Sequence, residues 1–269
     1  MQKSILFKNA KISFSDIGKG TAVVLIHGFL ENSSMWKETV SEISKKNRII
    51  SIDLLGHGKS DCLGYVHSME LFAKTIEAVL KHLRIRKYIL VGHSLGGYVA
   101  LALAEKHPQK VKGLCLMNST SNADNEERKN LRLRANNMIQ NNFTNMVRMS
   151  FSNLFGKKSR TLYKEEMEVA INQALQTPMQ GYIAAQEGMR IRPNRNDVLT
   201  KNNFKKLIII GEKDPVLSFA SSLEEAKKTN CEIVVFPDGH MSHIENKNEL
   251  ITELQRFIKI LRNNSQKNE

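Results

Sequence analysis

Short, continuous apolar runs alternate along this chain with longer segments of helical periodicity. Seven runs are predicted to be strands: Lys11–Phe14, Ala22–Ile26, Arg48–Asp53, Tyr88–Val91, Val111–Met117, Lys206–Ile210 and Glu232–Phe236. Most are unbroken by polar residues, which is typical of strands buried on both faces. The sequence therefore predicts an α/β fold with a mostly parallel central sheet flanked by helices. For the first run, an antiparallel hairpin with Ile5–Phe7 at the sheet edge is the alternative.

One interval interrupts this alternation. Between Ser121 and about Lys201 the sequence has helical patterns and no convincing strand, and six of the 11 methionines lie there. A structureless loop of this length is rare in a compact domain. We expect residues 1–120 and 201–269 to form the core and residues 121–200 to form an inserted helical cap. Met146, Met149 and Met241 are candidates to line a substrate pocket, and core filling is the alternative role for the cap methionines.

Composition excludes several classes of protein. The formal charge of +13 is spread along the chain without a basic run or interleaved aromatic residues, so we expect no nucleic-acid partner. No apolar run approaches the roughly 18 residues that a membrane-spanning helix needs. Three scattered cysteines without a CxxC pair predict neither a disulfide framework nor a zinc site, and favour the cytoplasm. The sequence does not indicate an oligomeric state.

The strongest local motif is Gly92-His-Ser94-Leu-Gly96, which lies between an apolar strand run and a helical pattern rich in small residues. A serine at a sharp strand-to-helix turn is held in a strained conformation, and the flanking glycines allow neighbouring chains to pass closely. The motif predicts Ser94 as a nucleophile. The turn also directs the backbone N–H of Leu95 toward a reacting carbonyl oxygen, and the N–H of Phe29, in the loop after an earlier strand, is a second candidate donor.

A serine nucleophile requires a general base, and the base requires a carboxylate that orients it. Among the eight histidines, His240 and His243 lie in one loop after the last strand run, and position alone does not choose between them. Asp214 follows the end of another strand run, where the functional groups of open α/β sheets collect. Gly239 before His240 permits a tight loop, which favours His240 as the base.

These motifs together resemble the α/β-hydrolase family of serine hydrolases. The resemblance is carried by His27-Gly28-Phe29, Asp53, Gly56-His57-Gly58, Ser60, Gly92 to Gly97, Gly211 with Asp214, and Gly239-His240 with Glu245. It implies that Ser94 attacks an acyl carbon, that His240 moves the proton, and that Asp214 holds the His240 tautomer. It also implies that the N–H groups of Phe29 and Leu95 stabilise the oxyanion.

We therefore expect an enzyme, a serine hydrolase that acts on carboxylic esters or related small acyl substrates through an acyl-enzyme. We expect it to need no metal and no organic cofactor. Two alternatives stay open. The same fold also supports hydrolysis of carbon–carbon bonds and lyase reactions, and some relatives are ligand-binding signalling receptors with slow turnover. The identity of the acyl and leaving groups depends on how the cap packs.

Overall fold

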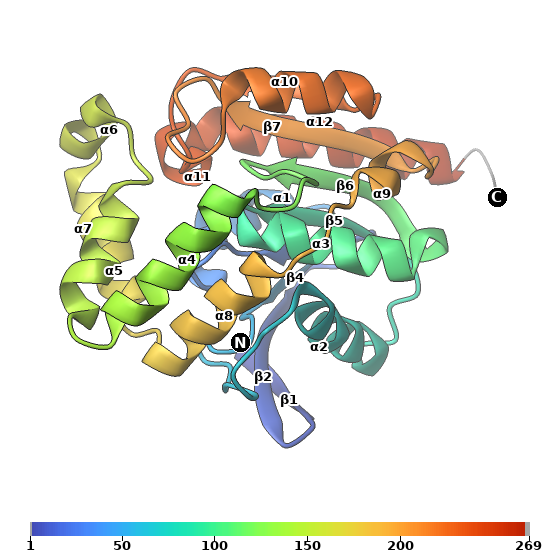
Figure 1. Ribbon diagram of the computed structural model, residues 1–269. Coiled ribbons are helices and arrows are strands. Elements are labelled where there is room, and N and C mark those ends of the chain that lie inside the picture. The colour runs from blue at the N-terminus through green and yellow to red at the C-terminus, as the bar shows by residue number, and fades with distance from the viewer. Residues whose placement is uncertain (1, 267–269) are drawn as a thin grey trace.

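The computed structural model of the protein, which describes residues 2–266, has an eight-stranded sheet covered by helices on both faces (Figure 1). The strand order across the sheet is β1-β2-β4-β3-β5-β6-β7-β8. The strands are β1 (Gln2–Phe7), β2 (Ala10–Ile17), β3 (Ala22–Ile26), β4 (Arg48–Ile52), β5 (Tyr88–His93), β6 (Val111–Met117), β7 (Lys205–Gly211) and β8 (Glu232–Phe236).

Only the β1 edge of the sheet is antiparallel. β1 pairs with β2, and β2 with β4, in antiparallel register, whereas β3 to β8 pair in parallel. β1 and β2 form the hairpin that the sequence offered as an alternative, and β2 extends beyond the predicted run. The predicted fold class, a mostly parallel sheet flanked by helices, is confirmed.

The helices of the core lie in two layers. The first apolar cluster packs α2 (Met69–His82), α3 (Leu95–Lys106) and α10 (Phe219–Lys228) on one face of the sheet. The second cluster packs α1 (Lys37–Ile43) and α12 (Lys247–Gln266) on the other face. Two 3-10 turns, η1 (Ser33–Trp36) and η2 (Pro108–Lys110), lie in the connections.

Alternate residues of one strand bury against opposite layers, which explains why the strand runs are continuously apolar. In β3, Val24 and Ile26 belong to the first cluster, whereas Val23 and Leu25 belong to the second. All four side chains are fully buried. A strand with two buried faces needs no polar alternation.

The segment between β6 and β7 contains helices and no strand. We call residues 126–200 the helical insertion; it comprises α4 (Glu126–Ile139), α5 (Phe143–Ser152), α6 (Lys157–Leu162), α7 (Lys164–Ala174), α8 (Met179–Arg190) and α9 (Asn196–Thr200). A third apolar cluster, which includes Val147, Phe151 and Tyr182, holds most of it together. Helices α4 to α7 lie beside the carboxyl ends of the parallel strands, where the β7 arrow ends (Figure 1). The last short helix of the core, α11 (Ser242–Glu245), lies near these strand ends.

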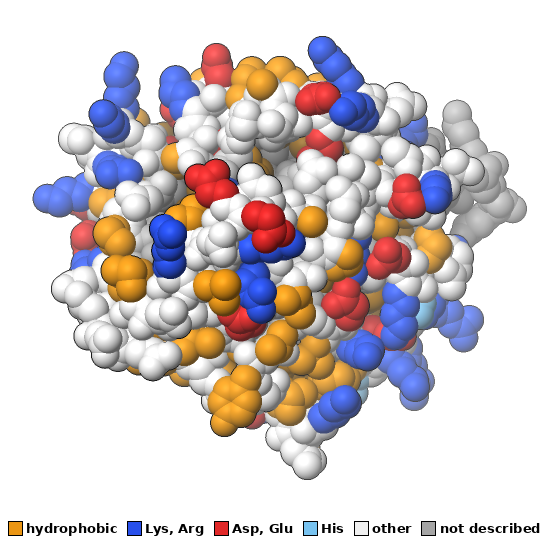
Figure 2. All heavy atoms as spheres, viewed as in Figure 1, with side chains coloured by type: hydrophobic (Ala, Val, Ile, Leu, Met, Phe, Trp, Pro, Cys, Tyr) orange, Lys and Arg blue, Asp and Glu red, His pale blue; other side chains and the backbone are white. Residues whose placement is uncertain are grey.

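The surface carries charges of both signs. Lys and Arg side chains are scattered over the face in Figure 2, with Asp and Glu between them. This distribution agrees with the even spread of basic residues along the sequence. Within residues 2–266, every helix is too short or too polar to pass through a lipid bilayer.

Candidate active site

Ser94 stands at a strained turn between β5 and α3. Its backbone has φ 49° and ψ −114°, a conformation that costs a residue with a side chain about 1–3 kcal/mol. The glycines on either side make the turn possible. A Cβ on Gly92 would lie 2.3 Å from the carbonyl oxygen of Gly96, and one on Gly96 would lie 2.2 Å from that of Ile26. The sequence of the turn is thus dictated by close backbone packing.

The three residues predicted as nucleophile, base and acid lie in one hydrogen-bonded row. His240 Nε2 is 2.9 Å from Ser94 Oγ, and His240 Nδ1 is 2.7 Å from Asp214 Oδ2. They come from three connections at one edge of the sheet, after β5, β7 and β8. A carboxylate can only accept, so Nδ1 of His240 carries the proton and Nε2 is free to accept the Ser94 hydroxyl proton. This geometry allows general-base activation of the hydroxyl group.

Asp214 is fixed by the backbone around it. Its Oδ1 accepts the N–H groups of Val216 and Leu217 at 2.8 and 3.0 Å, and Asn118 donates to Oδ2 at 3.2 Å. Burial alone would raise the pKa of Asp214, but His240 and these N–H donors outweigh it and hold the pKa below its usual value. Asp214 is therefore an anion with one defined orientation, directed at the imidazole of His240.

The loop after β3 and the start of α3 supply the two candidate oxyanion donors. Leu95 is the first residue of α3, so its N–H lacks a partner within its own helix. Phe29 lines the cavity at Ser94. The loop that carries Phe29 is held by His27, whose buried Nε2 accepts the N–H of Leu54 at 2.9 Å.

A cavity of about 450 Å³ opens over Ser94 and His240, between the core and the helical insertion. Its apolar lining includes Phe29, Leu30, Phe151, Leu154, Tyr182 and Met189.

None of the three methionines predicted for the pocket lines this cavity. Met146 and Met241 belong to the third apolar cluster, and Met149 is 53% exposed. The prediction for these side chains therefore needs correction, because the packing of α5 turns Met146 into the insertion core and leaves Met149 outside it. Met189 on α8, which the sequence did not single out for the pocket, lines the cavity in their place.

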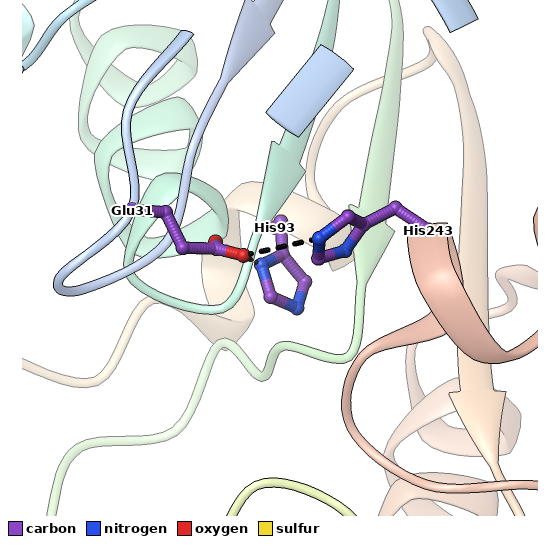
Figure 3. A group of neighbouring side chains, drawn as sticks. All are labelled: Glu31, His93 and His243. Carbon is purple, nitrogen blue, oxygen red and sulfur yellow. Dashed lines mark hydrogen bonds and ion pairs between the residues drawn. The ribbon is translucent and has the colours of Figure 1, made fainter. Parts of the chain in front are cut away.

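Beside the row lies a buried cluster formed by Glu31, His93 and His243 (Figure 3). The carboxylate of Glu31 faces both rings; Oε2 is 2.6 Å from His93 Nδ1, and Oε1 is 3.4 Å from His243 Nε2. Two imidazoles and a carboxylate are ligands that suit a transition metal. Their ligating atoms lie within 4.8 Å of one another, which is close enough to surround one metal ion.

The hydrogen bonds of His93 decide whether the cluster fits a metal ion. Its Nδ1 faces the Glu31 carboxylate, and its Nε2 is 2.9 Å from the backbone carbonyl of His240. Both partners are acceptors only, so both ring nitrogens carry protons and neither has a lone pair for a metal. Burial lowers the pKa of His93, but the Glu31 carboxylate more than reverses this and raises it above the ordinary value. The cluster fits a buried carboxylate–imidazolium pair better than a metal shell.

Three residues of this region escaped the sequence analysis. Glu31 lies three residues after Gly28 and directly before the polar segment Asn32-Ser33-Ser34, so no local pattern distinguishes it from a surface carboxylate. Arg128 and Arg132 line the cavity from α4. They lie in a strongly polar helix, and nothing in the spacing of such a helix tells which side chains face a cavity.

The chain matches a described protein family and individual relatives in sequence. The profile of a family described as alpha/beta hydrolase fold matches residues 21–247. An uncharacterised protein of Mycobacterium tuberculosis is 37% identical over 107 residues, which are 40% of this chain and 31% of that protein. The chain thus spans about a third of the length of this relative. A 3-oxoadipate enol-lactonase of Acinetobacter baylyi is 23% identical over 253 residues, which cover 94% of each chain.

A solved structure is similar over nearly the full length. It is a thermophilic esterase from Thermogutta terrifontis, with malate bound, which superposes with a TM-score of 0.91. The identity is 26%, and the alignment covers 97% of this chain and 99% of that one.

Proposed function

The chain belongs to the α/β-hydrolase fold family, and from that premise we propose that it is a serine hydrolase of carboxylic esters or related small acyl substrates. The observation that carries the proposal is the continuous hydrogen-bonded row from Ser94 through His240 to Asp214. The esterase and the enol-lactonase named above act, by their names, on ester bonds, and the lactone is a cyclic ester. Both names agree with the class of reaction proposed for this chain.

In the proposed reaction Ser94 Oγ attacks the acyl carbon while its proton passes to His240 Nε2. The N–H groups of Phe29 and Leu95 bind the oxyanion of the tetrahedral intermediate. His240 then gives the proton to the leaving alcohol, which departs and leaves an ester on Ser94. Water attacks this acyl-enzyme by the same route in reverse, which releases the acid and restores the hydroxyl group. Asp214 stabilises the imidazolium that forms in each half.

The helical insertion serves in this proposal as a cap that selects the substrate. The cavity lies between it and the core, and much of its apolar lining comes from α5 and α8. The groups that carry out the chemistry come from the core alone. Changes in the insertion should therefore alter substrate preference more than the reaction of Ser94.

The test is labelling with a fluorophosphonate probe, followed by turnover of 4-nitrophenyl esters of graded chain length. The wild-type protein should label once, and Ser94→Ala should remove the label and lower kcat by a factor on the order of 10⁴–10⁶. Ser41→Ala, at an exposed position of α1, is the matched control and should keep both. Labelling that persists in Ser94→Ala, or an intact protein that hydrolyses no ester, would refute the proposal. The second result would favour a binding role.

A further inference from the structure

Three arginines share one buried carboxylate beside the cavity. Asp124, whose side chain is fully buried, is 2.5 Å from Arg132 Nε, 2.8 Å from Arg192 Nη1 and 3.5 Å from Arg128 Nε. These four side chains carry a net charge of two positive units. Arg192 and Arg132 are largely buried, whereas the side chain of Arg128 is 37% exposed. A buried cation is costly unless it is paired, and Asp124 alone does not balance the two buried arginines, so the site favours an additional anion.

Two of the three arginines line the cavity. Arg128 and Arg132 lie one helical turn apart on α4 and both line the cavity that holds Ser94 and His240, whereas Asp124 is outside its lining. Arg192 packs behind the lining, with its guanidinium 3.9 Å from the centroid of the Tyr98 ring. A ligand in this cavity therefore meets Arg128 and Arg132, whereas Asp124 lines a neighbouring pocket, which it shares with Arg128 and Arg192. Arg128 also donates from Nη1 to the carbonyl of Val216 at 2.9 Å.

Other charges in the lining do not offset the positive charge of these arginines. The only carboxylate among the lining residues that the structure describes is Glu31, and it is already paired with His93. Arg132 donates from Nε to Asp124 and from Nη1 to Gln186, at 2.5 and 2.7 Å. Its Nη2 has no acceptor among the residues that the structure describes. Arg132 is thus a largely buried cation with an unused donor, held rigidly by two other contacts.

From these contacts we propose that the substrate is an anionic ester, whose carboxylate binds to Arg132 and Arg128 while its scissile carbonyl lies at Ser94. This inference rests on the proposed function and names its substrate class. A guanidinium group matches a carboxylate in geometry and can donate two parallel hydrogen bonds to it. The cavity, at about 450 Å³, has room for a small ester that reaches from Ser94 to α4.

The test compares charged esters with neutral esters of the same shape. Ethyl hydrogen adipate is paired with ethyl 6-methylheptanoate, in which an isopropyl group replaces the carboxylate of the acyl chain. The ester of hexanoic acid with 3-hydroxypropanoate is paired with 3-methylbutyl hexanoate, which places the same change on the alcohol. Proton release gives kcat/KM for each ester. The wild-type enzyme should prefer the charged member of at least one pair by about 10- to 100-fold, the range of one charged hydrogen bond.

Variants of the two arginines connect the preference to the site. Arg132→Gln and Arg128→Gln should each lower the ratio of charged to neutral kcat/KM by about tenfold or more, mainly through KM, whereas Arg132→Lys should keep part of it. Arg148→Gln, on the half-exposed face of α5, is the control and should leave the ratio unchanged. Fluorophosphonate labelling of Ser94 verifies that each variant is folded.

Two results would overturn the inference. One is equal or faster turnover of the neutral member in both pairs by the wild-type enzyme, and the other is an unchanged ratio in both glutamine variants. In either case Ser94 would still label and neutral esters would still be cleaved, so the proposed function would stand. A protein that neither labels nor cleaves any of the four esters would refute both.

Discussion

Replacing Glu31 by glutamine tests the buried ion pair beside the active-site row. The carboxylate is 4% exposed and accepts the N–H of Gly28 at 2.7 Å in addition to its contact with His93. Glutamine keeps the shape. Both contacts fall on Oε2, so the glutamine oxygen in that place can accept the N–H of Gly28 and the N–H of His93 Nδ1. Glu31→Gln therefore removes the negative charge while it keeps an acceptor for both donors.

The size of the effect follows from the pKa of Glu31. Burial would raise that pKa, but the positive charges of His93 and His243 outweigh it, and the pKa falls from 4.5 to about 2. Because burial lowers the pKa of His243 to about 4, His93 is the cation that faces Glu31 at neutral pH. A carboxyl group whose pKa is lower in the folded protein stabilises the fold at pH values above its pKa in the unfolded chain. This stabilisation is lost as the pH falls through the pKa of the folded state. The difference corresponds to about 3 kcal/mol, present at pH 6 and lost between about pH 4.5 and pH 2.

Urea unfolding at pH 3, 4, 5 and 6 measures this contribution. The free energy of unfolding of Glu31→Gln should lie about 3 kcal/mol below that of the wild type at pH 6, and the gap should shrink to about 1 kcal/mol at pH 3. Glu38→Gln, at an exposed position of α1, is the control and should show a small gap that does not change with pH. A gap for Glu31→Gln that stays constant from pH 3 to pH 6 would refute the ion pair as described.

Three further predictions concern the turn, the base and the cavity. His240→Gln should lower kcat/KM and the rate of fluorophosphonate labelling by about 10⁴-fold, whereas His243→Gln should keep most of both; the opposite pattern would move the base to His243. Gly96→Ala should lower the free energy of unfolding by about 1–3 kcal/mol, because its Cβ would overlap a backbone carbonyl, and an unchanged urea midpoint would contradict the packing described. Ala135→Leu, in the cavity lining, should shift turnover toward shorter acyl chains, and Met149→Ala, outside the lining, should not. Equal effects of the two variants would contradict the cavity lining described above.

The sheet was predictable from the sequence because burial on both faces leaves a strong local signal. The runs at β3 and β6 were predicted to the residue, since strands that bury alternate side chains in opposite layers are almost wholly apolar; β3 has no polar residue and β6 has Lys112 alone. β2 was predicted too short because it lies near the antiparallel edge, where residues such as Ser15 and Asp16 remain in the strand. The turn at Ser94 was recognisable because strain and close packing restrict its neighbours to glycine.

The cavity was not predictable to the same degree. Which side of α4 or α5 faces Ser94 is decided by how the insertion helices pack on each other, and that information is spread over distant residues. Arg132 is held by Asp124 and Gln186, from outside its own helix. Asp124 lies eight residues before it and Gln186 lies 54 residues after it. A pattern read along α4 does not contain these contacts, so composition pointed to the methionines instead.

The pair formed by Glu31 and His93 links two parts of the proposed mechanism. Glu31 accepts the N–H of Gly28, next to the proposed oxyanion donor Phe29, while His93 donates to the backbone carbonyl of the proposed base His240. The strands β3 and β8 are not neighbours in the sheet. The loops that follow them are both fixed to the pair formed by Glu31 and His93. Catalysis of acyl transfer needs the base and the oxyanion donors at a defined separation, and misplacement of 1 Å can cost about 100-fold. A charged pair is well suited to hold that separation, because the low dielectric around it strengthens both contacts as long as both charges remain.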